Sequence, residues 1–429
     1  MAVMASAGDP AHSAEGPPAA TRYSWIVFAL SFGLLISDYM ARQVLNAVFP
    51  LLKAEWLLSD AELGLLSGVV ALMVGFLTFP LSLAADRWGR VRSLALMAML
   101  WSLATLFCAV AASYTQMLVG RVMVGVGEAA YGSVGIAVVI SVFPQRMRAT
   151  LSAAFMAGGL FGQVLGVAIG GEIAASFGWR AAFAAIGIFG MLLAIAYPLI
   201  VREVRIAAIA NLSPRNSAAP KLPLRTLVAG RTVRLTYLAS GLQLFAAGAL
   251  PAWLPSYFNR YYAMPVDVAG RTAAALLLVC GIGMIVCGIV SDRAAVGRPD
   301  RKIMLAAGYG VGSAVALSSA LALPPGPTQL ILLGVAMFLV AGTTGPAGAM
   351  VANLTPLALH GSAFATLTLA HNLIGLAPGP ILTGRIADAI GLLDALRLLP
   401  LACIAAALTF LAARRSYRGD LGTVAAATA

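Results

Sequence analysis

The stretch Asp86-Arg87-Trp88-Gly89-Arg90 separates two apolar runs of the chain, 62–84 and 93–111. The first run holds a single charged residue, Glu62, and the second holds none. Each run has roughly the 20 residues that an α-helix needs to cross the hydrocarbon core of a membrane, whereas a barrel strand would alternate over about ten. The stretch is therefore predicted to be a short polar turn between two membrane-spanning helices.

A related stretch, Gly288-Ile289-Val290-Ser291-Asp292-Arg293, is followed by Gly297-Arg298 and again ends an apolar run. The apolar runs on either side of these two related polar stretches predict twelve membrane-spanning helices, six on each side of a polar region. These helices are expected near 23–52, 62–84, 93–111, 115–143, 150–175, 181–201, 235–258, 272–290, 304–323, 329–354, 362–386 and 392–412. Because the copies occupy equivalent places in the two sets of six, we predict a duplicated six-helix unit.

The polar region, 202–234, holds three prolines and seven Lys or Arg residues. It is predicted to be a cytoplasmic linker between an N-terminal bundle at 23–201 and a C-terminal bundle at 235–412. Residues 1–22 are rich in Ala, Pro, Gly and Ser and are predicted to form a disordered cytoplasmic tail. Residues 413–429 are predicted to form a second cytoplasmic tail.

The composition requires a lipid environment. The chain is 61% hydrophobic and only 10% charged, whereas a soluble domain carries about 25% charged residues. In lipid each backbone polar group must be satisfied within its own segment. The expected fold class is therefore an all-α integral membrane protein, with twelve transmembrane helices in two pseudo-symmetric six-helix bundles.

Most of the 28 Lys and Arg residues fall in the loops on one side of this arrangement, the side that carries both chain ends. Positive residues mark cytoplasmic loops, so both termini are predicted to be cytoplasmic. Together with the short loops, this pattern is typical of a multi-pass protein of the cell inner (plasma) membrane.

The same distribution explains the net charge of +12 without nucleic acid as a partner. The four cysteines lie inside apolar runs and lack metal-ligand spacing. We find no nucleotide-binding loop, metal cluster or nucleophile–base arrangement, so the chain is not expected to be an enzyme, an ATP-driven pump or a cofactor-binding protein. The lipid bilayer is the partner that the composition requires.

At the two polar turns the chain resembles the major facilitator superfamily, whose signature between helices 2 and 3 is Gly-x-x-x-Asp-Arg-x-Gly-Arg-Arg/Lys. Ser82 stands in place of the first Gly and Val91 in place of a basic residue, which Arg92 follows. The resemblance implies the major facilitator fold and a loop that latches the cytoplasmic side. The residues carried over to this gate motif are Asp86, Arg87, Gly89, Arg90, Gly288, Asp292 and Arg293.

Two further runs resemble the spinster-like transporters and the anion:cation symporters. Helix 1 carries Asp38-Tyr39-Met40-Ala41-Arg42-Gln43, and helix 4 carries a Gly127-Glu128-Ala129 run. Those groups often show Asn-Tyr-x-x-Asp-Arg in helix 1. Here Asp38 stands in place of the Asn and Ala41 in place of the Asp, so the acidic residue is displaced by about one helical turn.

Four ionisable residues lie inside the predicted N-terminal helices: Asp38, Arg42, Arg121 and Glu128. A charge near the bilayer centre costs roughly 3 kcal/mol or more, so such residues usually face the protein interior or a wet cavity. At 1.5 Å per residue, Asp38, Arg42 and Glu128 lie roughly 21, 27 and 22 Å from the inner ends of their helices. They are therefore predicted to share one layer.

This layer favours a hypothesis of proton coupling. Arg42 is the fixed cation that binds a substrate carboxylate, and Glu128 and Asp38 compete for it. When the substrate takes Arg42, a released carboxylate in a low-dielectric site favours its protonated form. Two other roles for the layer stay open: a static ion-pair network that pins helices 1 and 4, and substrate binding without protons.

Further candidate substrate-binding residues are Arg121, Tyr39, Tyr131 and, in the C-terminal half, His371. For the tyrosines a packing role is an equal alternative, and His371 fits a helix interface as well. Gly158, Gly162, Gly166 and Gly170 are spaced by four and predict a close helix contact. Pro378, Gly379 and Pro380 predict a bend in helix 11.

The sequence thus predicts a proton-coupled secondary transporter that moves a small organic anion by alternating access and acts as a monomer. The absence of a Gly-Pro dipeptide in helix 5, which the family's antiporters carry, favours symport. Alternatives are an amphiphile, lipid or drug transporter and a passive uniporter. A membrane receptor or enzyme without transport is the alternative from a different class.

Overall fold

The computed structural model describes residues 21–144, 147–203, 205–206, 227–296, 298, 300–356 and 359–428. These residues fold into helices and contain no strand. Twelve helical segments among them are long and apolar enough to cross a membrane, which confirms the predicted number. Nearly all of the predicted tail at 1–22 and most of the predicted linker at 202–234 lie outside the described residues.

The N-terminal half consists of α1 (Arg22–Trp56), α2 (Asp60–Trp88), α3 (Arg90–Ala109), α4 (Tyr114–Glu128), α5 (Tyr131–Ser141), α6 (Arg148–Phe177) and α7 (Trp179–Ile200). The C-terminal half consists of α9 (Arg231–Tyr261), α10 (Val266–Ala294), α11 (Asp300–Ala322), α12 (Pro327–Val340), α13 (Thr344–Asn353), α14 (His360–Ala370), the π-helix η4 (His371–Leu376), α15 (Pro378–Ile390), α16 (Leu392–Arg397) and α17 (Leu399–Thr428).

The last helix is longer than the sequence predicted. A tail was expected from residue 413, but α17 continues to Thr428. Tyr417 is fully buried in the C-terminal half, and the Asp420 carboxylate accepts the backbone N–H of Thr232 at 2.8 Å. These contacts hold the extension against the start of α9.

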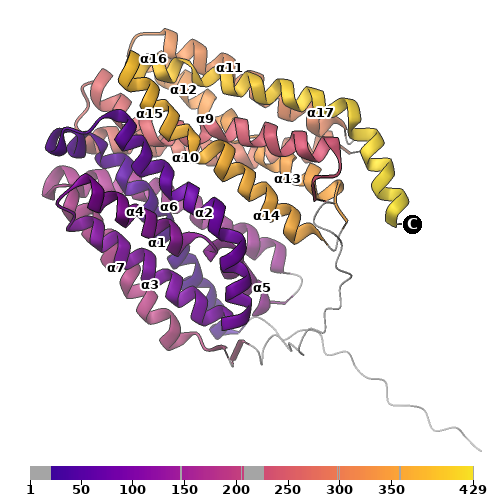
Figure 1. Cartoon of the computed structure of the whole chain (residues 1–429), viewed down its shortest axis with the longest axis horizontal. Helices are drawn as coiled ribbons and strands as arrows, with labels where there is room; N and C mark the ends of the chain where they lie inside the picture. The colour runs from indigo at the N-terminus through magenta and orange to yellow at the C-terminus, as the bar shows by residue number, and fades with distance from the viewer. Residues whose placement is uncertain are drawn as a thin grey trace, which may run out of the picture.

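The two halves lie side by side, with α2 against η4 and α15 and with α6 against α10 (Figure 1). Because the spans are even in number, α1 begins and α17 ends at the same end of the bundle. We call this end the terminal face and the other end the opposite face.

The hydrophobic cores differ between the two faces. Toward the opposite face one core joins both halves and includes Phe49 and Trp253, whose rings lie 5.3 Å apart. Toward the terminal face the described residues form two separate cores, one around Trp101 in the N-terminal half and one around Phe410 in the C-terminal half. The halves are thus closed together at the opposite face and have independent cores at the terminal face.

Polar contacts reinforce this closure. The Asp60 carboxylate, only 5% exposed, accepts hydrogen bonds from Lys53 at 2.5 Å and from both terminal nitrogens of Arg260 at 2.6 and 2.7 Å. Asp388 of α15 accepts the backbone N–H groups of Asp60 and Ala61 at 2.7 and 2.9 Å. The start of α2 is therefore capped by a side chain from the other half.

Candidate functional site

The charged layer is built on α1, which packs closely against α6. A Cβ on Gly162 would meet the Ile36 carbonyl and the Tyr39 side chain, and one on Gly166 would meet the backbone of Met40. The predicted glycine stripe is thus the contact surface for α1. This close approach fixes the rotation of α1, and with it the direction in which Asp38 and Arg42 project.

Arg42 and Glu128 form an ion pair between α1 and α4. Both Nε and one terminal nitrogen of Arg42 donate to the same carboxylate oxygen of Glu128, Oε2, at 3.0 and 2.7 Å. The Glu128 side chain is fully buried, whereas that of Arg42 is 19% exposed. The pair therefore presents its cation, not its anion, toward the accessible side.

Glu128 is the last residue of α4, because the helix breaks at Ala129 and Ala130 before α5 begins. The break is held by Thr78 of α2, whose hydroxyl donates to the Ala129 carbonyl at 2.7 Å. A helix C-terminus carries partial negative charge, which opposes a carboxylate there. Arg42 is therefore the positive group that faces Glu128 at this helix end.

Asp38 lies beside this pair, is 4% exposed, and interacts with both Glu128 and Arg42. Its Oδ1 has no hydrogen-bond partner among the described residues, and neither has Oε1 of Glu128. Two buried carboxyl groups thus share a single nearby arginine head group that contacts one oxygen. A proton held between the two acids would satisfy both unpaired oxygens.

Arg121 is fully buried and holds the backbone of neighbouring helices. It donates to the carbonyls of Ala41, Arg42 and Leu66 at 2.8, 3.0 and 3.2 Å. Its donors are thus engaged with main-chain oxygens at the root of the Arg42 side chain. Its predicted substrate contact stays a prediction, and the geometry adds a positioning role.

The two predicted tyrosines lie differently. The Tyr39 ring is partly exposed and lies 5.3 Å from the guanidinium carbon of Arg42. Tyr131 is fully buried, donates its hydroxyl hydrogen to the Ser31 carbonyl at 2.8 Å, and packs edge-on against Trp101 at 4.9 Å. Tyr39 is the tyrosine that borders the ion pair.

A line of neutral polar side chains next to Arg42 was not predicted. Asn46 donates to Gln43 at 2.6 Å and accepts from Ser67 at 3.0 Å, and Gln43 reaches Gln163 of α6 at 3.5 Å. The available signal was spacing, because Asp38, Arg42 and Asn46 follow one another by four on α1.

The C-terminal half contributes His371 at the start of η4. One ring nitrogen of His371, Nε2, lies 2.7 Å from the Ser240 hydroxyl of α9. The neighbouring Asn372 is 4% exposed, donates to the Thr368 carbonyl at 2.9 Å, and leaves its Oδ1 without a partner. Asn372 was not among the predicted site residues.

Contacts with α2 show that the polar groups of the two halves lie at the same level along the bundle. A Cβ on Gly75 would meet the Asn372 side chain, and Thr78, one turn further, bonds to the residue after Glu128. The polar groups of the two halves therefore flank the same turn of α2.

The gate-motif residues occupy the terminal face. Glu203, after α7, accepts the backbone N–H groups of Arg90 and Val91, each at 2.9 Å, and Gly89 adopts the positive φ of 95°. Arg87 is exposed, and the side chain of Asp86 lies outside the described part. The sequence did not single out Glu203.

In the second copy Asp292 forms an ion pair with Lys302 at 2.8 Å, and Arg293 is exposed. Gly288 lies against Gly345 of α13, where a Cβ on Gly345 would be 3.3 Å from the Gly288 Cα. The glycine of the second copy thus permits close packing of α10 and α13.

The described residues contain no group of three or more His, Cys, Asp or Glu side chains that could hold a metal ion. The site is therefore a set of one buried ion pair, a second buried acid and neutral hydrogen-bonding groups. Such a set can bind an anion and can bind or release a proton.

The chain is similar to known transporters. The chain is 28% identical over 332 residues to a probable L-galactonate transporter of Escherichia coli (strain K12), covering 73% of each chain. It is 24% identical to Protein spinster homolog 1 of Xenopus laevis, covering 55% of this chain and 46% of that protein. The crystal structure of a bacterial homolog of the human lysosomal transporter Spinster, inward-facing and occupied, superposes with a TM-score of 0.81 at 21% identity, covering 93% of this chain and 98% of that chain.

Residues 31–380 match the sequence model of one family, described as the Major Facilitator Superfamily. The matched region includes the charged layer, both polar turns and η4. With twelve spans, two packed halves and this match, the chain belongs to the Major Facilitator Superfamily and is a membrane transporter.

Proposed function

We propose that the protein is a proton-coupled transporter of a small organic anion. The observation that carries the proposal is the shared arginine. Arg42 bonds to one oxygen of Glu128, while Glu128 and Asp38 each keep one buried oxygen without a partner. Two adjacent buried carboxylates cannot both stay ionised beside a single cation without a large energetic penalty.

The coupling follows from competition for Arg42. With one proton between Asp38 and Glu128, the pair of acids carries one negative charge, which Arg42 balances. When a substrate carboxylate binds Arg42 in a two-pronged manner, Glu128 loses its partner at the negative end of α4. Glu128 then takes up a second proton, so anion and proton occupy the site together.

The chemistry of the accessible group supports an anion as the substrate. Arg42 is the exposed member of the ion pair, and the neutral line through Asn46 and Gln163 offers hydrogen bonds to hydroxyl groups. A probable L-galactonate transporter among the relatives fits a hydroxylated acid. Tyr39 borders the same space, and His371 and Asn372 offer polar groups from the other half.

The two different faces support alternating access. The joint core and the Asp60 ion pairs close the opposite face, while the cores at the terminal face remain separate. By the positive-inside rule the terminal face is cytoplasmic, in a cell inner membrane. The described state is then inward-facing, and a monomer contains both halves that the cycle requires.

The test is uptake into proteoliposomes that hold a pH-sensitive dye, with a panel of sugar acids, other carboxylates and lysolipids. Wild-type protein is expected to bring protons in together with a carboxylate substrate. Glu128→Gln removes the exchangeable proton, so uptake should continue down the substrate gradient without proton entry and without dependence on a pH gradient.

Glu55→Gln is the matched control. Glu55 also pairs with an arginine of the N-terminal half, Arg180, at 2.8 Å, but its side chain is 39% exposed near the opposite face. This variant should keep full coupling. Proton entry that persists in Glu128→Gln would refute the coupling proposal, and transport of lysolipids in place of carboxylates would refute the anion proposal.

A further inference from the structure

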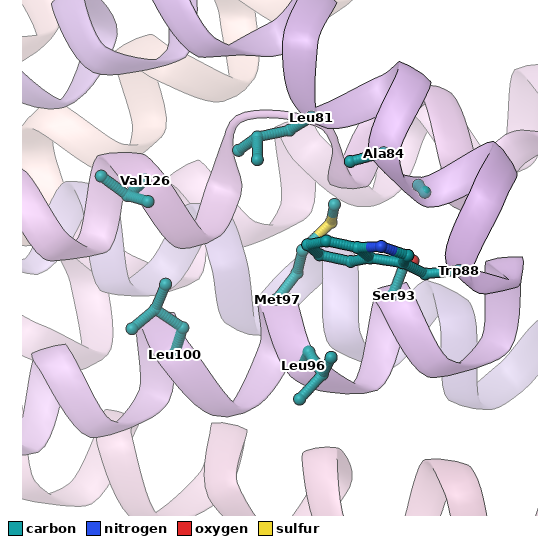
Figure 2. A pocket seen from close by; sticks show the side chains of 9 residues that line it. Leu81, Ala84, Trp88, Ser93, Leu96, Met97, Leu100 and Val126 are labelled. Atoms are coloured by element: carbon teal, nitrogen blue, oxygen red, sulfur yellow. The ribbon is translucent and has the colours of Figure 1, made fainter.

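An apolar hollow lies away from the charged layer, between α2 and α3 near the terminal face (Figure 2). It has a volume of about 130 Å³ and is lined by Leu81, Ala84, Ala85, Trp88, Ser93, Leu96, Met97, Leu100 and Val126. The Trp88 indole lies between the two helices and is 63% exposed. Leu96, on α3, is 57% exposed and borders the same opening.

The residues that line the hollow follow one another along α2 and α3. Leu81 and Trp88 are seven residues apart on α2, so the lined stretch extends about 10 Å along that helix. Its mouth is at the exposed Trp88, where α2 ends. Aromatic side chains at such helix ends lie at the level of lipid head groups. The hollow therefore extends from head-group depth into the hydrocarbon region.

Two arginines flank lining residues of the hollow in the sequence. Arg87 and Arg92 immediately precede the lining residues Trp88 and Ser93, are both exposed, and form no ion pair among the described side chains. The nearby Glu203 carboxylate is committed to the backbone N–H groups of Arg90 and Val91. Both exposed guanidinium groups are thus available to an anion at the surface.

Ser93 supplies an independent sign of a ligand. It is 2% exposed, and its hydroxyl has no hydrogen-bond partner among the described residues. A buried hydroxyl without a partner is unfavourable. Because Ser93 lines the hollow just inside the mouth, an ester or phosphate oxygen entering there would accept its proton.

We propose that this hollow binds an anionic phospholipid from the leaflet at the terminal face. One acyl chain occupies the apolar hollow, and the phosphate lies between Arg87 and Arg92. An ester or phosphate oxygen accepts a hydrogen bond from the Ser93 hydroxyl. Basic groups at helix ends above an apolar groove are the chemistry that binds anionic head groups. The site is separate from the transport layer and does not depend on the proposed substrate.

The test uses quenching of Trp88 fluorescence by lipids with brominated acyl chains. Purified protein is reconstituted with increasing fractions of brominated phosphatidylglycerol or brominated phosphatidylcholine. The chain has six tryptophans, so the Trp88 signal is the difference between the wild type and Trp88→Phe. Half-maximal quenching is expected at a roughly 5- to 25-fold lower fraction of the anionic lipid, since each of the two arginines contributes up to roughly fivefold.

Two variants separate head group from chain. Arg87→Gln/Arg92→Gln should remove the preference for phosphatidylglycerol while leaving quenching by phosphatidylcholine. Ala84→Leu places a larger side chain in the hollow and should weaken quenching by both lipids. The control is Arg293→Gln/Arg298→Gln, which removes two exposed arginines from the equivalent turn of the other half and should keep the preference.

Equal quenching by the two lipids in the wild type would overturn the proposal. A loss of preference in the control pair would also overturn it, because the preference would then come from net surface charge. Retained preference in Arg87→Gln/Arg92→Gln would exclude the assigned head-group contacts.

Discussion

At the residue scale, the geometry of Arg42 decides how the site works. Its two donors converge on one oxygen of Glu128, so the planar fork is rotated away from the two-pronged contact that a carboxylate allows. A substrate carboxylate can make that fuller contact. In the proposed mechanism the substrate displaces Glu128 from Arg42, so the stability of the ion pair would set the affinity for substrate.

Arg42→Lys tests whether the paired donors of the guanidinium group are needed for substrate binding. Lysine keeps the positive charge but loses the paired donors, so Glu128 retains a partner while the substrate loses a hydrogen bond to a charged group. Such a bond contributes about 1.5–3 kcal/mol. We expect KM for the substrate to rise roughly tenfold or more, with the number of protons per substrate unchanged. An unchanged KM would show that the substrate does not bind Arg42.

Which of these residues the sequence could reveal depends on their chemistry. Charges inside apolar runs are conspicuous, and helical rise placed Arg42 and Glu128 at one depth, where the structure shows them in contact. The partners of Arg121 are main-chain carbonyls, which any residue provides. Asn46 and Ser67 are neutral and common in helices, so their hydrogen bonds could not be predicted without the fold.

At the element scale, the informative features are two departures from the straight helix. Pro378 lacks the N–H that would bond to the carbonyl four residues earlier, and its ring clashes there. The chain responds with the π-helix η4, closed by the Ala377 N–H on the Asn372 carbonyl at 2.9 Å. The sequence predicted a bend at the prolines, and the structure shows a π-helix that begins at His371, seven residues before Pro378.

The break after Glu128 had no such signal. Ala129 and Ala130 favour helix, and the interruption depends on Thr78 of α2 and on Ser133, whose hydroxyl donates to the Ala130 carbonyl at 2.9 Å. A tertiary contact thus overrides local propensity at the most important acid of the site. Features of this kind cannot be predicted from α4 and α5 alone.

Gly162→Val tests the contact between α1 and α6. A side chain there meets the backbone at Ile36 and the base of Tyr39, so the helices must separate. Overpacking of this kind costs about 1–3 kcal/mol. We expect a lower unfolding temperature and weaker substrate binding, measured by thermal unfolding with and without substrate.

Gly308→Val is the control, because nothing lies within 4 Å of the position of its Cβ. It should leave the unfolding temperature nearly unchanged. Equal effects of the two substitutions would mean that the glycine stripe of α6 does not set the helix spacing.

At the scale of the whole molecule, the opposite face holds the two halves together. Arg260 of the C-terminal half donates two hydrogen bonds to the Asp60 carboxylate of the N-terminal half. Asp388 of the C-terminal half caps the start of α2. Opening this face requires both contacts to break. Under the proposed alternating access, their strength would contribute to the balance between the two access states.

Asp60→Asn should shift this balance. It removes the charge that Arg260 and Lys53 share, and breaking a buried pair is strongly destabilising to the state that contains it. We expect the population open at the opposite face to grow roughly several-fold. The measurement is electron–electron distance between spin labels at Leu57→Cys and Ile390→Cys, both exposed positions, in protein without its four native cysteines.

The control is Asp394→Asn, which removes an exposed ion pair with Arg397 inside the C-terminal half. It should leave the distance distribution unchanged. A distribution in Asp60→Asn that matches the wild type would show that the Asp60–Arg260 ion pair does not govern opening.

The charge of the central layer also bears on the membrane potential. In the proposed mechanism Arg42 balances two acids that share one proton, so the layer formed by Asp38, Arg42 and Glu128 would be neutral when empty. A monoanion that arrives with one further proton leaves it neutral again. The loaded and the empty transporter then carry the same charge through the electric field, and an imposed potassium diffusion potential should leave the rate of monoanion uptake unchanged. A dianion carried with one proton would instead be slowed by a potential that is negative inside.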